Sequence, residues 1–170
     1  MTSLTCEDNI NYFQPTGFHV VFDRKHYGHL QFFVAKVQHP GAQNDANTTP
    51  FKRASVHLPG NTMTYGDLTL DVILDEDFES YKEMYNWLLR LVNEDQIAES
   101  MGYSNARHPI PTYADIHVTA LSNHNNKNIT FKYIDCVPTS IGDIPFDAQN
   151  QGVDYVSYPA TFKFSYFTIE

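Results

Sequence analysis

The feature that most restricts the fold of this sequence is a set of short runs in which apolar and polar residues alternate. In "DLTLDVILD" the apolar residues Leu68, Leu70, Val72 and Leu74 occupy every second position. Because the side chains of a β-strand point alternately to its two faces, such a run predicts a strand with one buried face. An apolar strand face needs another layer packed over it. The sequence therefore favours a mainly β protein of the sandwich or barrel type.

Further strands are predicted where similar runs recur. They cover residues 18–23, 30–37, 113–121 and 129–134, a short strand before the Pro59-Gly60 turn in "RASVHLPGNTMTYG", and the final "YPATFKFSYFTIE". The polar turn "RKHYGH" predicts a hairpin between the first two, and "SNHNNKN" predicts another between 113–121 and "ITFKYI". In the last run, Phe162, Phe164 and Tyr166 are predicted to share one face.

One amphipathic helix is predicted over about residues 77–93. Asp75 or Asp77 is a suitable cap for the exposed amides at its start, and the nearby glutamates suit the positive end of the helix dipole. Apolar residues then recur at steps of three and four, as on a helix that packs on a core. The predicted packing residues are Phe78, Tyr81, Tyr85, Trp87, Leu88 and Val92. We expect this helix to cover one end or one face of the β core.

The stretch from residue 39 to 53 is predicted to be a long loop. It contains two prolines and a cluster of Gly, Asn, Asp and Thr, without an apolar period. A connection of about 15 residues in a small domain is usually either functional or disordered, and both readings stay open from the sequence alone.

Length and charge narrow the functional classes. A chain of 170 residues fits one domain, and its net charge of −9 disfavours a general nucleic-acid binder. Charged residues make up only 18% of the chain, which hints that part of the surface is covered by partners. Cys6 and Cys136 lie in no metal or disulfide motif, which favours a reducing compartment. No secretion signal or membrane span is predicted.

Catalytic and cofactor motifs are missing from the sequence. It has no nucleotide-binding glycine loop, nucleophile elbow or zinc motif, so we expect no cofactor, no metal site and no enzyme activity. Two weaker candidates exist. His26 and His29 are spaced as a pair of metal ligands, and Asp115 and His117 share one strand face as a base and its orienting group. Cys136 is predicted to be a small buried apolar residue.

Three stretches, taken together, resemble a known family. In "LTLDVILDEDFESYKEMYNWL" a strand ends in acidic residues and leads directly into a helix with a central Trp. In "FKYIDCVPTSIGDIPFDAQNQGVDYVSYPATFKFSYF" a strand is followed by a small turn, an Asp-containing loop and a closing aromatic strand. The early "PTGFHVVFDR" and "LQFFVAKVQHPG" form an opening strand pair. Over most of residues 15–170 the sequence resembles the tail-tube proteins of contractile-tailed bacteriophages.

The resemblance implies a fold and an assembly. The fold is a two-sheet β-sandwich or barrel with one flanking α-helix, formed by residues 15–170 as a single domain after an N-terminal arm of residues 1–14. Six copies join their sheets into a ring with a continuous inner barrel, and the rings stack into a tail tube. The long loop of residues 39–53 then contacts neighbouring subunits, through Pro40, Gly41, Asn44, Asp45, Asn47 and Pro50.

The resemblance also implies partners and a location. The partners are further copies of the chain and the tail sheath, tape-measure and baseplate proteins. DNA passes through the lumen during ejection without specific binding, repelled by the acidic balance of the protein. The location is the phage tail in the virion, after assembly in the host bacterial cytoplasm.

Three alternatives remain from the sequence. The "SNHNNKN" turn and the N-terminal arm depart from the plain tube pattern and fit a baseplate tube-initiator, terminator or adaptor ring of the same fold. A β-sandwich that binds a glycan or another small ligand is the second alternative. An enzyme that uses Asp115 and His117 is the third.

Overall fold

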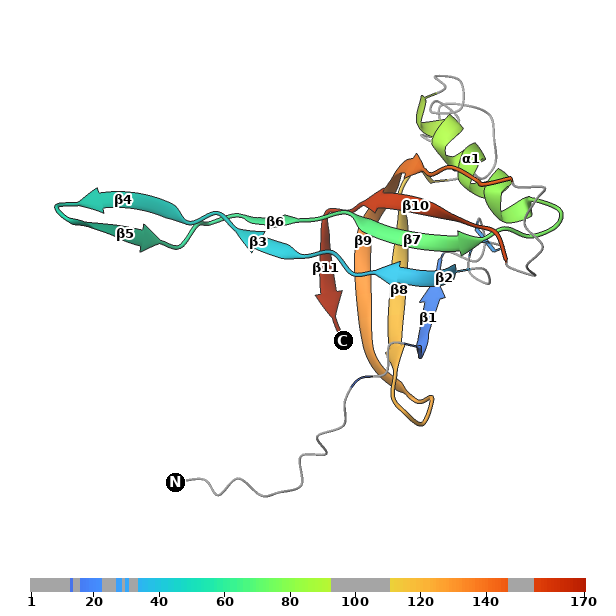
Figure 1. Ribbon diagram of the computed structural model, residues 1–170, viewed down its shortest axis with the longest axis horizontal. Coiled ribbons are helices and arrows are strands. Elements are labelled where there is room, and N and C mark those ends of the chain that lie inside the picture. The colour runs from blue at the N-terminus through green and yellow to red at the C-terminus, as the bar shows by residue number, and fades with distance from the viewer. Residues whose placement is uncertain are drawn as a thin grey trace.

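The computed structural model describes residues 13, 16–22, 27–28, 30, 34–92, 111–146 and 155–170, and Figure 1 shows their arrangement. Its strands and helix are β1 (Phe18–Val21), β2 (Val34–Gln38), β3 (Ala42–Asn44), β4 (Asn47–Phe51), β5 (Ala54–Leu58), β6 (Met63–Tyr65), β7 (Leu68–Ile73), α1 (Glu79–Val92), β8 (Ala114–Leu121), β9 (Lys127–Ile141), β10 (Ser157–Lys163) and β11 (Tyr166–Ile169).

Two antiparallel layers form the body of the protein. Strands β1, β8, β9 and β11 form the layer that we call sheet A, and β9, β10, β7 and β2 form sheet B. The strand β9 is 15 residues long and belongs to both, because its first part pairs with β8 and β11 and its last part with β10. Asp135, between these parts, has a φ of 56°. The mainly β two-sheet fold with one helix is confirmed.

The alternating runs produce the buried faces that they predict. On β7 and β8 every second residue is buried, namely Leu68, Leu70, Val72, Ala114, Ile116 and Val118. The hairpin of β8 and β9 is also as predicted, with Val118 opposite Phe131. The alternation therefore locates the interface between the two sheets.

Two strand predictions are wrong. Strands β1 and β2 do not pair with each other, since β1 pairs with β8 and β2 with β7. The final run is not one strand either, because the chain turns at residues 164–165 and passes from sheet B to sheet A. As a result Phe162 is buried while Tyr166 is 49% exposed.

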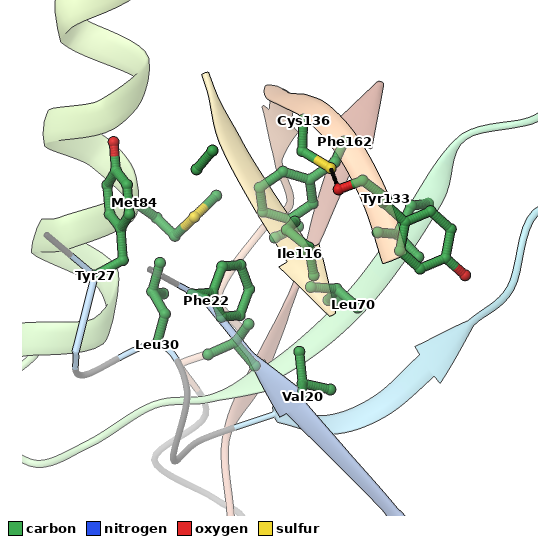
Figure 2. Close-up of a cluster of buried hydrophobic side chains, with 14 of the residues drawn as sticks. Val20, Phe22, Tyr27, Leu30, Leu70, Met84, Ile116, Tyr133, Cys136 and Phe162 are labelled. Carbon is green, nitrogen blue, oxygen red and sulfur yellow. Dashed lines mark hydrogen bonds between the residues drawn. The ribbon is translucent and has the colours of Figure 1, made fainter. Parts of the chain in front are cut away.

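The core between the sheets continues beneath the helix. Figure 2 shows Val20, Phe22, Leu70, Ile116 and Phe162 in one cluster with Met84 of α1. The indole of Trp87 is fully buried, and its Nε1 donates a hydrogen bond of 2.8 Å to the Thr112 carbonyl. Its ring stacks on that of Tyr27, with centroids 4.2 Å apart. The helix thus covers part of the core, as expected.

The helix is rotated relative to the prediction. Its buried positions are Ser80, Met84 and Trp87. Among the predicted packing residues, Phe78, Tyr81 and Leu88 are half-buried, whereas Tyr85 is 53% and Val92 80% exposed. The prediction for Tyr85 and Val92 is wrong. The reason is that the wide apolar stripe of α1 fits two orientations, and the bulky Trp87 occupies the space beneath the helix.

Asp75 begins the helix, as one of the two predicted caps. Its carboxylate accepts hydrogen bonds from the amides of Glu79 and Ser80, at 2.9 and 3.1 Å, and from the Ser80 hydroxyl at 2.8 Å. Burial raises the pKa of this carboxyl, but the hydrogen bonds from Ser80 and Glu79 outweigh it and hold the pKa below its ordinary value. Phe78 just before the helix has a φ of 57°. The acidic turn therefore has a structural purpose.

Candidate assembly surfaces

The predicted loop is a β-ribbon that projects from the body, which we call the arm (residues 41–66). Strand β3 pairs with β6, and β4 pairs with β5 further out (Figure 1). The prediction of an irregular loop is therefore wrong. Every side chain from Gly41 to Pro59 is exposed, including the predicted contact residues Gly41, Asn44, Asp45, Asn47 and Pro50, whereas Pro40 is buried at the base.

The outer ribbon has two unlike faces. In its register Phe51 lies opposite Ala54, Thr49 opposite Val56 and Asn47 opposite Leu58, so these side chains share one face. The other face carries Thr48, His57, Pro50 and Ser55. We call the first one the apolar arm face. No described part of the body packs on it, and the ammonium of Lys52 at the tip lies 6.0 Å from the centre of the Phe51 ring. Phe51, Val56 and Leu58 on it are 64%, 45% and 49% exposed.

A joint between the inner and outer ribbons holds the arm extended. The Asn44 side chain donates a hydrogen bond of 3.1 Å to the Gly60 carbonyl and accepts one of 3.0 Å from the Gly60 amide. A Cβ atom at Gly60 would lie 1.6 Å from the Asp45 carbonyl oxygen. The chain therefore needs a glycine here, because any side chain would separate the two strands at this point.

Sheet A ends in two strand edges without a partner strand in the described part of the chain. They belong to β1, which pairs only with β8, and to β11, which pairs only with β9. Proteins usually protect such edges with lysine, proline or a bulge, yet Phe18–Val21 and Tyr166–Ile169 contain none of these. Both edges are ready to pair with another chain.

The outward side of sheet A is polar, and its charges nearly balance. Asp115 and His117 lie there on β8, and Lys132 of β9 forms an ion pair of 2.6 Å with Glu170. Most acidic residues of the described part lie elsewhere, with Asp75, Glu76, Asp77, Glu79 and Glu83 gathered around the helix start. The acidic balance of the chain is therefore not concentrated on this sheet.

The carboxylate of Asp115 is hydrogen-bonded to the backbone of β9 and not to His117. It accepts a hydrogen bond of 3.1 Å from the amide of Asp135, where β9 bulges. Both Asp115 and His117 line a shallow pocket of about 370 Å³ together with Asp135. Over the described residues no hydrogen bond joins Asp115 to His117. Asp115 therefore does not orient His117 as a general base.

An apolar groove lies between the sheets next to the base of the arm. It measures about 400 Å³, with Phe18, Ala120 and Phe131 from sheet A and Ala35 and Val37 from β2 among its lining residues. These side chains come from both layers, and Phe13 of the N-terminal segment also lines the groove.

His39 fixes the base of the arm beside this groove. Its Nδ1 lies 2.6 Å from the Tyr133 hydroxyl, and its ring packs against Phe131 and Phe167 with centroids 4.7 and 5.1 Å away. Burial lowers the pKa of the imidazole and favours its neutral form. Burial likewise raises the pKa of the Tyr133 hydroxyl above its ordinary value. The pair anchors the end of β2.

Of the remaining candidates, only Cys136 lies among the described residues. Cys136 is fully buried, as predicted, and burial raises its thiol pKa to about 12. In the parts of the chain that the structure covers, no three His, Cys, Asp or Glu side chains gather as metal ligands. The pair His26 and His29, Cys6 and most of the 1–14 arm lie outside the described residues. No described helix has the length and apolar character needed to cross a membrane.

Comparison with known proteins agrees with this geometry. The family model of the phage tail tube protein matches residues 5–170. This chain belongs to the phage tail tube protein family. A comparison with curated protein sequences gives no match.

Solved structures share the tail tube fold at low sequence identity. The tube-terminating cap of the anti-feeding prophage has a TM-score of 0.68 at 15% identity, with 99% of both chains covered. The sheath-tube complex of the PVC extracellular contractile injection system contains a chain with a TM-score of 0.67 at 14% identity, covering 100% of this chain and 99% of that one. A chain of the anti-feeding prophage baseplate reaches 0.60 at 8% identity, with 90% of both covered. These similarities establish the fold.

Proposed function

We propose that this tail tube family member forms rings that stack into the tube of a contractile, phage-like tail. The observation that carries the proposal is the pair of unprotected edges of sheet A. An edge of β1 in one copy and an edge of β11 in the next are different surfaces of the same chain, so their pairing is head-to-tail, and it closes as a ring when the rotation between copies divides a full turn. Closure satisfies the backbone groups that a single copy leaves unpaired.

Six copies are the proposed ring size. The support is the resemblance in sequence to tail-tube proteins and the similarity in fold to a baseplate that was solved with six-fold symmetry. In such a ring the four strands of sheet A from each copy form the inner barrel, and their outward side lines the lumen. Sheet B and the helix α1 then form the outer layer.

DNA ejection is the proposed use of the lumen. The side of sheet A assigned to it carries few charges, and Lys132 is neutralised by Glu170. A phosphate backbone therefore meets no excess of positive charge to bind it. This near-neutral wall allows passage by lack of attraction, rather than by the strong acidic repulsion expected from the net charge.

Partners and location follow from the same proposal. The chain contacts further copies of itself, a sheath outside the tube, a tape-measure protein and a baseplate, and no membrane. The similarity to a chain of a sheath-tube complex supports the contact with a sheath. We place the protein in the virion tail, after assembly in the cytoplasm of the host bacterium. Its role is structural, without enzyme activity.

A terminating ring is the second candidate function. The similarity to a chain in the structure of a tube-terminating cap equals the similarity to a chain of a sheath-tube complex, with TM-scores of 0.68 and 0.67. The two roles differ in stacking. A tube subunit forms long tubes by itself, whereas a cap stops at single or paired rings, so electron microscopy of the purified protein distinguishes them.

One substitution tests the ring directly. The amide and carbonyl of Glu170 bond to Thr130 within the subunit, so in the alternating ladder those of Ile169 point to the free edge. Ile169→Pro removes one edge donor and leaves the internal ladder intact. We expect the variant to stay folded but to lose ring formation, whereas the matched Ile169→Val keeps it. Normal rings from Ile169→Pro would overturn pairing at this edge.

A further inference from the structure

Two histidines lie on the outward side of sheet A, the side that the proposed function assigns to the lumen. His19 on β1 and His117 on β8 alternate with the buried Val20 and Val118, so their side chains point away from the core. His19 lies opposite Thr119, which is two residues from His117 on the same strand. The two imidazoles are therefore diagonal neighbours on one face, a separation of about 7–8 Å that long side chains can bridge.

A lysine on the next strand extends this pair. Lys132 on β9 lies directly opposite His117, so side chains that can carry a positive charge occupy the adjacent strands β1, β8 and β9. The Lys132 ammonium forms an ion pair of 2.6 Å with Glu170. The hydrogen bond from Lys132 lowers the pKa of the Glu170 carboxyl most, and the charges of Lys132, Lys127 and His117 add to this effect. His117 therefore belongs to the same electrostatic neighbourhood as the ion pair.

The carboxylates on this side have partners other than the two histidines. Glu170 is paired with Lys132, and Asp115 accepts its hydrogen bond from the Asp135 amide. Within the described ranges neither His19 nor His117 forms an ion pair or a hydrogen bond. Each imidazole can therefore gain a proton without breaking a contact of the folded chain.

The charge of this side depends on the two imidazoles. The other charged side chains that face it, among the described residues, are Asp115, Asp135, Glu170, Lys127 and Lys132. Three negative and two positive side chains leave a charge of −1 per copy when both imidazoles are neutral, and +1 when both are charged. Histidine changes its charge between about pH 5 and 8. Acidification therefore reverses the sign of this surface.

A closed ring concentrates the effect. In the proposed ring β11 of the next copy lies beside β1, so the side chains that come to face His19 are Glu170 and the uncharged Tyr166 and Thr168. Glu170 is already paired with Lys132 of its own copy. Every copy adds its two imidazoles to one lumen, and a channel lined by one sign of charge focuses its field on what passes through.

We propose that His19 and His117, together with Lys132, form a site on the lumen wall that binds DNA phosphates when the imidazoles are charged and releases them when they are neutral. A charged imidazole donates hydrogen bonds from both ring nitrogens and displaces counterions from a phosphate. The wall then lets DNA pass at neutral pH and retains it at acidic pH. This inference rests on the proposed function, since it needs the outward side of sheet A to line a lumen.

DNA binding to assembled rings at two pH values tests the site. Rings are mixed at low salt with a fluorescent single-stranded oligonucleotide at about pH 8 and at about pH 5.5, and fluorescence anisotropy measures the affinity. We expect the affinity of the wild type to rise about tenfold or more on acidification, because each neutralised phosphate releases counterions. For the same reason the rise should shrink as salt is added.

A matched pair of double variants separates this site from the general loss of negative charge on acidification. His19→Gln with His117→Gln removes both imidazoles of the site, and its affinity should change less than about threefold between the two pH values. His57→Gln with His124→Gln removes two exposed imidazoles, from the arm and from the turn between β8 and β9, and should respond as the wild type does. Equal responses of the two double variants would overturn the site.

The remaining outcomes separate the inference from the proposed function. Electron microscopy first shows which proteins form rings, and His19→Gln alone, at an exposed position, replaces the double variant if that one does not assemble. The single variant should show a smaller rise in affinity than the wild type. Wild-type rings with the same DNA affinity at both pH values would overturn the site, while the ring stands. A wild-type chain that forms no ring would remove the lumen, and the proposed function would fall with it.

Discussion

The body and the arm of this protein are both β-structure, but they differ in what holds them together. In the body, β7 alternates between buried and half-buried residues over a core that includes Trp87 and Phe162. In the arm, strands β3, β4 and β5 expose every side chain. The body is stable through its own packing, whereas the arm has hydrogen-bonded strands with nothing beneath them. Exposed structure of this kind indicates a surface that is completed by assembly.

The largest loss of stability should come from truncating the core residue Trp87. Trp87→Ala deletes a fully buried indole and its hydrogen bond to Thr112, so we expect a loss of about 3–5 kcal/mol in the free energy of unfolding. Urea denaturation of the unassembled chain measures it. The same truncation of the exposed Tyr85 should cost less than about 0.5 kcal/mol. Similar losses for both would show that the helix packs through its other face.

The helix cap should have a moderate effect. Asp75→Ala removes three hydrogen bonds at the start of α1 and should cost about 0.5–2 kcal/mol in unfolding experiments. Asp77→Ala, at an exposed position beside it, is the control. An equal cost for Asp77 would contradict the assignment of the cap.

The same carboxyl predicts a pH dependence of stability. Because its pKa is lower in the folded than in the unfolded state, its contribution is present above the unfolded value and is lost as the pH falls through the folded one. Denaturation at a series of acidic pH values should therefore show a smaller loss for Asp75→Ala than for the wild type. Parallel curves for the two proteins would remove the carboxyl from the acid response.

A substitution in the arm joint should abolish assembly and leave the stability of the body nearly unchanged. Gly60→Ala places a Cβ against the Asp45 carbonyl, so the outer ribbon must shift relative to the inner one. We expect the free energy of unfolding of the body to change by less than about 0.5 kcal/mol, since no core side chain is touched. Ring or tube formation seen by electron microscopy should be lost. Gly41→Ala, where a Cβ meets nothing, is the control, and an assembling Gly60→Ala would make the joint dispensable.

The smallest change in stability is expected from cutting the arm tip. Lys52 and Arg53 form the exposed turn between β4 and β5, where trypsin cleaves. We expect cleavage there in free chains, with little change in the stability of the body, and protection in assembled rings. Mass spectrometry of the fragments over time measures both rates. Equal cleavage of free and assembled protein would mean that the arm stays exposed in the ring.

The sequence predicted the parts of the fold that leave a short-range periodic pattern of apolar residues. The alternation of Leu68, Leu70 and Val72 located a buried face because one side of β7 meets the core. The same reasoning placed β8 and β9 in a hairpin, since a short polar turn joins them. It failed for β1 and β2, because pairing between distant strands leaves no mark on the local pattern.

The candidate surfaces were harder to predict because they are defined by what the isolated chain lacks. The alternation of Val56 and Leu58 is typical of a strand. The Gly, Asn and Pro residues before β5 favoured a loop, so β4, the partner of β5, was not predicted. Register was needed to show that Phe51 and Val56 share a face. The free edges of sheet A likewise depend on which strands end the sheet, which only the topology shows.

The single long strand β9 has a mechanical consequence. Since it runs through both layers, a force applied to the outer layer passes along one covalent chain into the layer proposed to surround the lumen. The two layers cannot slide past each other without breaking the hydrogen bonds that β9 makes with β8 and β11 in one layer and with β10 in the other. A cylinder built from such units would resist torsion and shear as one wall, which suits an object driven through a barrier by the contraction of its surroundings.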